Sequence, residues 1–187
     1  MPKPPQPWAR AAACAAVVGG LLPVAWRLHM LGWGAGWSQA PLFREGGALA
    51  YVLGLVTVEA GATLLTLGLV QRWGEVWPAW VPGLGGRRIP PRFVLTVAIT
   101  GATILTAIVA VTAWQLVDAT RRGISNPVTQ VEAGWLRAFM LAHYVPSVLW
   151  PLGLWVAIAG FALRHRDDEG VATRSVATRP GAGRLSA

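Results

Sequence analysis

Four long apolar runs, separated by short polar or glycine- and proline-rich segments, constrain this chain more than any other feature. The runs cover residues 11–31, 48–70, 93–117 and 143–163. A helix needs about 20 apolar residues to cross about 30 Å of hydrocarbon, and each run is long enough. Only 13% of the 187 residues are charged, about half the share found in soluble domains. The sequence therefore predicts an all-α integral membrane protein, a four-helix bundle of four spans.

The two ends of the chain differ from these runs. Residues 1–10 are proline-rich and basic, and residues 164–187 are polar without apolar periodicity. We expect both to be disordered tails. A cleaved signal peptide is an alternative for the first run, with "SQA" at 38–40 as the cleavage site. Because the apolar region is long for a signal and Arg27 and His29 interrupt the approach to that site, we favour a retained span.

The distribution of Lys and Arg predicts the orientation of the spans. Two basic residues lie in 1–10, four in 72–92 and five after residue 163, whereas the segments on the other side carry five in all. Cytoplasmic segments of membrane proteins carry the excess of positive charge. We therefore expect a multi-pass protein of the cell membrane with both termini in the cytoplasm, and with 32–47 and 118–142 outside.

The turn "RWGEVWPAWVPGLGGRRIPPR" at 72–92 has the composition of a segment held at the membrane surface. Tryptophan rings prefer the headgroup level, and arginine suits anionic lipids. Phosphate binding by "GLGGRR" is an alternative, but the segment lacks the P-loop lysine and is followed by proline. Three Trp and two Arg are the expected interface anchors: Trp73, Trp77, Trp80, Arg87 and Arg88.

The segment 118–142 is predicted to be partly helical. Asn126 is a suitable N-cap and Pro127 suits the first helical position. Apolar residues at a spacing of four then lead into the fourth run, with a bend expected near Pro146. This helix is expected either to lie in the outer interface or to cap the bundle.

Glu59 is the most informative polar residue, because it lies at the midpoint of the run 48–70. A charged carboxylate there costs about 2.5–3.5 kcal/mol on insertion scales, so such residues face the bundle. We expect Glu59 to be protonated and hydrogen-bonded to threonine or backbone, while Arg27 extends outward to the membrane surface. A buried ion pair between Glu59 and Arg27 is the alternative. The candidate intramembrane polar site comprises this acid, threonines of the second and third runs, and the arginine: Glu59, Thr63, Thr66, Thr96, Thr100, Thr103 and Arg27.

Residues that would indicate chemistry are scarce. The chain has no H-E-x-x-H, G-x-S-x-G or C-x-x-C, and Cys14 is the single cysteine. A metal site from His29, His143 and a carboxylate is conceivable, but histidines at helix ends are more often structural. We expect no catalytic residues, no cofactor and no metal. The net charge is +8, and the basic residues flank the apolar runs rather than forming one basic face. Nucleic acid is therefore not an expected partner.

Two segments resemble a group of uncharacterised actinobacterial four-span integral membrane proteins. They are "GLVQRWGEVWPAWVPGLGGRRIPP" (68–91), with its Trp-Gly turn after the second span, and "LLPVAWRLHMLGWGAG" (21–36), where a basic and aromatic cluster ends the first span. The resemblance implies a four-helix membrane architecture. It brings no activity, cofactor or catalytic residue.

Together these features predict a small non-enzymatic membrane component that acts through partner proteins or lipids. The expected partners are the lipid bilayer and either another membrane protein or further copies of the chain. The alternative is a small-molecule or ion transporter or channel that uses Glu59.

Overall fold

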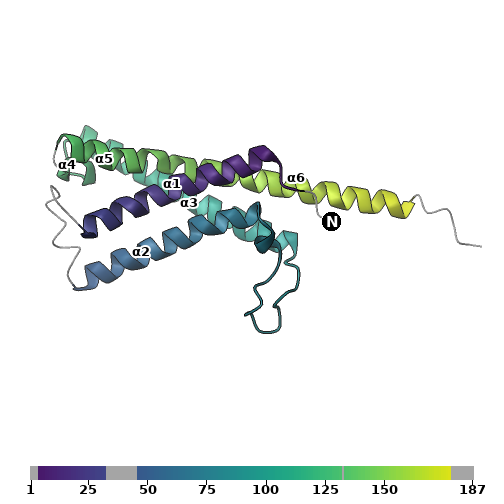
Figure 1. Ribbon diagram of the computed structural model, residues 1–187. Helices are drawn as coiled ribbons and strands as arrows, with labels where there is room; N and C mark the ends of the chain where they lie inside the picture. The colour runs from purple at the N-terminus through teal and green to yellow at the C-terminus, as the bar shows by residue number, and fades with distance from the viewer. Residues whose placement is uncertain (1–3, 33–45, 132, 178–187) are drawn as a thin grey trace, which may run out of the picture.

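The computed structural model describes residues 4–32, 46–131 and 133–177, and it is helical throughout its regular structure (Figure 1). Four helical stretches are long and apolar enough to cross a membrane: Pro7–Leu31, Leu49–Leu69, Pro91–Arg121 and Trp135–Arg166. The all-α architecture with four apolar spans is therefore confirmed, as expected of a multi-pass membrane protein. Most of the predicted external segment 32–47, residues 33–45, lies outside the described residues.

The helices follow one another with short 3-10 turns between them. In chain order they are α1 (Pro7–Gly32), α2 (Gly46–Leu65), η2 (Thr66–Leu69), η3 (Arg72–Glu75), α3 (Pro91–Arg121), α4 (Pro127–Gln130), α5 (Trp135–Tyr144), η4 (Val145–Val148) and α6 (Leu149–Ala177).

Both tails are shorter than predicted. Helix α1 begins at Pro7, because proline is tolerated in the first turn, where its missing N–H has no partner to lose. Helix α6 continues to Ala177, so the expectation of disorder is wrong for residues 164–177. That segment has no proline and a single glycine, so nothing in it breaks the helix. Residues 1–3 and 178–187 lie outside the described part.

Helices α1 and α6 form the central pair of the bundle, and small residues let them approach closely. Ala9, Ala13 and Ala16 of α1 are buried. A Cβ added at Gly153 of α6 would collide with the Ala12 carbonyl oxygen, and one at Gly160 would lie 2.6 Å from the Cβ of Ala9. Membrane helices associate through such small residues, since lipid gives no hydrophobic force between them.

The other two spans pack on this pair from different sides. Helix α2 lies along α1 (Figure 1), where Val24, Val52 and Val56 form a buried cluster. Helix α3 packs against α6 through Ala102 and its neighbours. Most of the α3 surface is exposed. The bundle therefore has a compact side and one peripheral helix.

The predicted helix in 118–142 is present and is interrupted. The Asn126 side chain accepts hydrogen bonds from two backbone N–H groups of α4, which confirms the N-cap. Helix α4 ends at Gln130, where Val131 is extended, and α5 begins after Gly134, whose φ of 115° is unfavourable for residues with a side chain. Buried residues from both sides, Trp26 and Met140 among them, form one cluster. From Trp135 onward the segment is part of the fourth candidate span, Trp135–Arg166, and it packs beside the C-terminal end of α1.

Candidate functional site

An ion pair inside the candidate spans joins α1 to α2. Nη1 of Arg27 donates to Oε2 of Glu59. The two side chains are 23% and 14% exposed, so the pair is largely enclosed by protein. The expectation that Arg27 extends alone to the membrane surface is therefore wrong, and the partner of the Glu59 carboxyl group is this arginine rather than a threonine.

The direction in which helical side chains lean explains this pair. Every Cα–Cβ bond in a helix tilts toward the helix N-terminus. Helices α1 and α2 are consecutive and antiparallel (Figure 1). The Arg27 side chain therefore leans along α1 toward the level of Glu59, and the Glu59 side chain leans along α2 toward the level of Arg27. Although Arg27 and Glu59 start at different heights along the two helices, their side chains lean toward each other and meet.

Two buried threonines, Thr63 of α2 and Thr66 of η2, follow the acid along the chain, and Tyr144 of α5 lies beside the arginine. The Thr63 hydroxyl donates to the Glu59 carbonyl oxygen at 2.7 Å, and the Thr66 hydroxyl donates to the Ala62 carbonyl at 3.4 Å. The two threonines thus lie near Glu59 as predicted, but they bond the main chain rather than its carboxylate. The Arg27 guanidinium carbon lies 5.8 Å from the ring centroid of Tyr144, a partner that sequence spacing gave no reason to expect.

The threonines of α3 do not belong to this site. Thr96, Thr100 and Thr103 are exposed on the peripheral helix. The Thr96 hydroxyl bonds the Arg92 carbonyl at 2.9 Å, and the Thr103 hydroxyl bonds the Ile99 carbonyl at 2.8 Å. The prediction that they partner Glu59 is wrong, because α3 packs against α6 and turns this face outward.

An aromatic cluster lies near the C-terminal end of α1. The Phe139 ring centroid is 5.5 Å from that of His29 and 4.3 Å from that of His143, and Trp26 contacts all three rings. The two histidines considered for a metal site therefore both contact the Phe139 ring. No three His, Cys, Asp or Glu side chains among the described residues gather closely enough to hold a metal ion.

The turn after the second span is a short hairpin. Val76 pairs with Arg88 in an antiparallel bridge. The Trp77 N–H donates to the Arg87 carbonyl at 2.9 Å, and the Gly86 N–H donates to the Trp77 carbonyl at 3.0 Å. Gly86 has a φ of 77°, a left-handed conformation that glycine adopts without penalty. The backbone of this turn is therefore fixed by its own hydrogen bonds.

The predicted anchors of the turn differ in their surroundings. The Trp77 ring lies 5.9 Å from that of Phe93 at the start of α3. Trp73 is 48% exposed and Trp80 is 81% exposed. Arg87 and Arg88 are exposed as well. The structure thus leaves two tryptophans and both arginines available for contact outside the chain.

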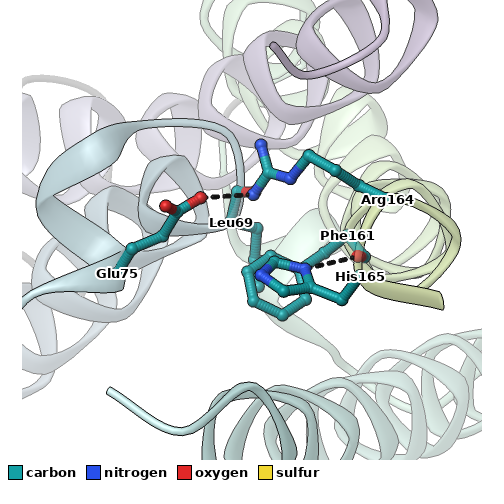
Figure 2. Close-up of polar contacts among 5 residues, drawn as sticks. All are labelled: Leu69, Glu75, Phe161, Arg164 and His165. Carbon is teal, nitrogen blue, oxygen red and sulfur yellow. Dashed lines mark hydrogen bonds and ion pairs between the residues drawn. The ribbon is translucent and has the colours of Figure 1, made fainter. Parts of the chain in front are cut away.

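A second buried ion pair ties the turn to the middle of α6 (Figure 2). Nη2 of Arg164 lies 2.8 Å from Oε1 of Glu75 and donates to the Leu69 carbonyl at 3.4 Å. The Arg164 side chain is 5% exposed and stacks over the Phe161 ring at 5.3 Å. Sequence reasoning missed this pair. The available signal was that Glu75 is the single acid in a turn with four arginines.

Comparisons with family models, with curated proteins and with solved structures found no match. The resemblance to actinobacterial four-span proteins therefore stays a prediction. The structure has three features on which a function can be based: two enclosed ion pairs, the exposed face of α3 and the exposed basic turn.

Proposed function

We propose that this protein is a small non-enzymatic component of the cell membrane that acts by binding another membrane protein through the outer face of α3. The proposed orientation has both termini in the cytoplasm. The excess of Lys and Arg in the tails and in 72–92 supports that orientation. The proposal of a partner rests on the way α3 is packed.

The two faces of α3 are opposite in character. Ala102 is buried against α6, with Ala98 and Leu105 beside it. The opposite face carries a row of exposed small residues at alternating spacings of four and three, which ends at the exposed Trp114: Thr96, Thr100, Thr103, Ala107 and Ala110. We call this row the small-residue face of α3.

The small-residue face is the observation that carries the proposal. Small residues and hydroxyls are enriched where one membrane helix approaches another, since they let the backbones come close. Bulky apolar side chains, such as Ile104 at 56% exposure and Ile108 at 57% exposure on the flank of the same helix, are suited to lipid. The face turned directly away from α6 therefore has the composition of an interface rather than of a lipid-facing surface.

Purification from native cells in a mild detergent, followed by mass spectrometry, tests this proposal. Thr100→Leu combined with Ala107→Leu should release the partner, because two bulky side chains then separate the helices. Ile104→Phe combined with Ile108→Phe adds bulk on the flank of the same helix instead and should leave the partner bound. If the partner is a second copy of the chain, two differently tagged copies should be recovered together, and the same two pairs of substitutions should respectively abolish and preserve that recovery. Equal recovery of every protein with both variants would contradict the proposal.

Transport of a solute or ion is the second candidate, and the Arg27–Glu59 pair is the observation that favours it. Ionisable residues inside membrane spans commonly mark substrate or ion pathways. In reconstituted vesicles, this candidate predicts a flux that Glu59→Gln abolishes while the protein still melts cooperatively. A flux equal to that of empty vesicles would eliminate it.

A further inference from the structure

The hairpin between α2 and α3 projects sideways from the bundle rather than along it. Figure 1 shows this segment leaving the ends of the two helices across the direction of the spans. In a membrane crossed by these helices, a segment with this direction follows the bilayer surface. The hairpin is thus placed to contact lipid headgroups beside the bundle.

The Glu75–Arg164 ion pair fixes the base of the hairpin against α6. Glu75 precedes the bridge at Val76, and its carboxylate bonds Arg164, a residue on the last part of the apolar stretch of α6 (Figure 2). The Ile89 N–H donates to the Glu75 carbonyl at 2.9 Å, which ties the returning strand to the same residue. The posture of the hairpin therefore depends on Glu75.

The same ion pair leaves the outer surface of the hairpin positively charged. Glu75 is the single acid in 72–92, and its charge is compensated by Arg164. Arg87, Arg88 and Arg92 are exposed. No carboxylate of the turn itself is left to neutralise these three arginines.

Apolar side chains are exposed on the same hairpin. Trp80 is 81% exposed and Leu84 is 40% exposed, and both lie between the two bridged strands. Tryptophan is favoured at the headgroup level, where its ring is apolar and its N–H is polar. Basic and aromatic groups on one segment at the ends of the spans match an anionic bilayer surface better than the surface of an acidic soluble protein.

We propose that the hairpin 76–88 is a docking surface for the headgroups of anionic glycerophospholipids. Arg87 and Arg88 face the phosphates, and Trp80 enters the headgroup layer. The Glu75–Arg164 ion pair holds the hairpin in this posture. This inference is independent of the partner proposed for α3.

Lipid selectivity of the full-length protein tests the docking surface. The purified chain is mixed with equal parts of phosphatidylglycerol and phosphatidylcholine, and native mass spectrometry gives the ratio of the two bound lipids. One basic residue near an anionic surface contributes about 1 kcal/mol, or about fivefold in affinity. Arg87→Gln combined with Arg88→Gln should therefore lower the preference for phosphatidylglycerol by up to about 25-fold.

A matched control removes the same charge from the other end of α3. Arg121→Gln combined with Arg122→Gln should leave the preference attributed to the hairpin in place. If the wild-type protein binds both lipids equally, the proposal is overturned. An acidic protein would then be the remaining candidate partner for this surface. A loss of preference that is equal in the two variants would overturn it as well.

Hydrogen exchange separates loss of charge from loss of fold and tests the role of Glu75. The Trp77 and Gly86 amides, which are hydrogen-bonded within the hairpin, should stay protected in the Arg87→Gln, Arg88→Gln variant. In Glu75→Gln the protection and the lipid preference should both fall. If Glu75→Gln changes neither, the ion pair does not set the posture of the hairpin.

Discussion

Removal of either partner of the Arg27–Glu59 pair should destabilise the protein strongly, and removal of both should restore much of the loss. The single changes are Glu59→Gln, which keeps the shape of the acid, and Arg27→Gln, which removes the charge and shortens the side chain. Each one leaves the other group enclosed between α1 and α2 without its counter-charge. Glu59 can take up a proton when its partner is lost, whereas Arg27 cannot lose one, so Glu59→Gln should cost more.

The expected magnitude follows from the burial of the pair. Breaking a buried pair from one side costs about 3–5 kcal/mol. The side chains retain 23% and 14% exposure, so we expect values near the lower end, about 3 kcal/mol for Glu59→Gln and about 2 kcal/mol for Arg27→Gln. The double variant carries two neutral amides and no uncompensated charge, and we expect it to lose only about 1 kcal/mol.

Unfolding titrations of the four proteins in mixed micelles with increasing denaturing detergent measure these free energies. The coupling energy of the double-mutant cycle is the decisive quantity, because it isolates the interaction between the two side chains. We expect at least about 2 kcal/mol. Additive single effects, within about 0.5 kcal/mol, would refute the reasoning and show that Arg27 reaches the membrane surface by itself.

Two further predictions concern close helix contacts and the cap. Gly153→Ala should destabilise the protein by about 1–3 kcal/mol in the same titration, because its Cβ meets the Ala12 carbonyl oxygen, whereas Gly101→Ala, with no neighbouring atom within 4 Å, should not. Asn126→Ala should cost about 0.5–2 kcal/mol and speed hydrogen exchange in the first turn of α4, since its side chain accepts from two N–H groups there at 3.0 and 3.1 Å. Unchanged exchange in that turn would show that the cap is not needed.

The elements that depend on local sequence could be predicted well. The four spans follow from hydropathy, because only an apolar helix satisfies its backbone in lipid. The cap at Asn126 follows from a residue preference that acts over a few positions. The helical extension of α6 to Ala177 was missed, because a polar sequence without apolar periodicity does not reveal whether it continues a helix.

The contacts between helices could not be predicted in the same way. They depend on which spans are neighbours, and hydropathy contains no information on that order. Thr100 was assigned to Glu59 although α3 packs against α6. The Glu75–Arg164 pair joins residues separated by 89 positions, and it forms only because the end of α2 lies beside the middle of α6.

The four-span topology supports every other inference, and cysteine labelling tests it most directly. In a Cys14→Ala background, single cysteines replace Leu84 in the hairpin and Ile124 at the other end of α3, since both are exposed, at 40% and 54%. Gly85 is unsuitable, because a Cβ there would lie 2.7 Å from the Ala79 carbonyl oxygen. A membrane-impermeant reagent should label Ile124→Cys in intact cells and Leu84→Cys only after permeabilisation. The reverse pattern would contradict the proposed orientation, and labelling of both from one side would contradict the third span itself.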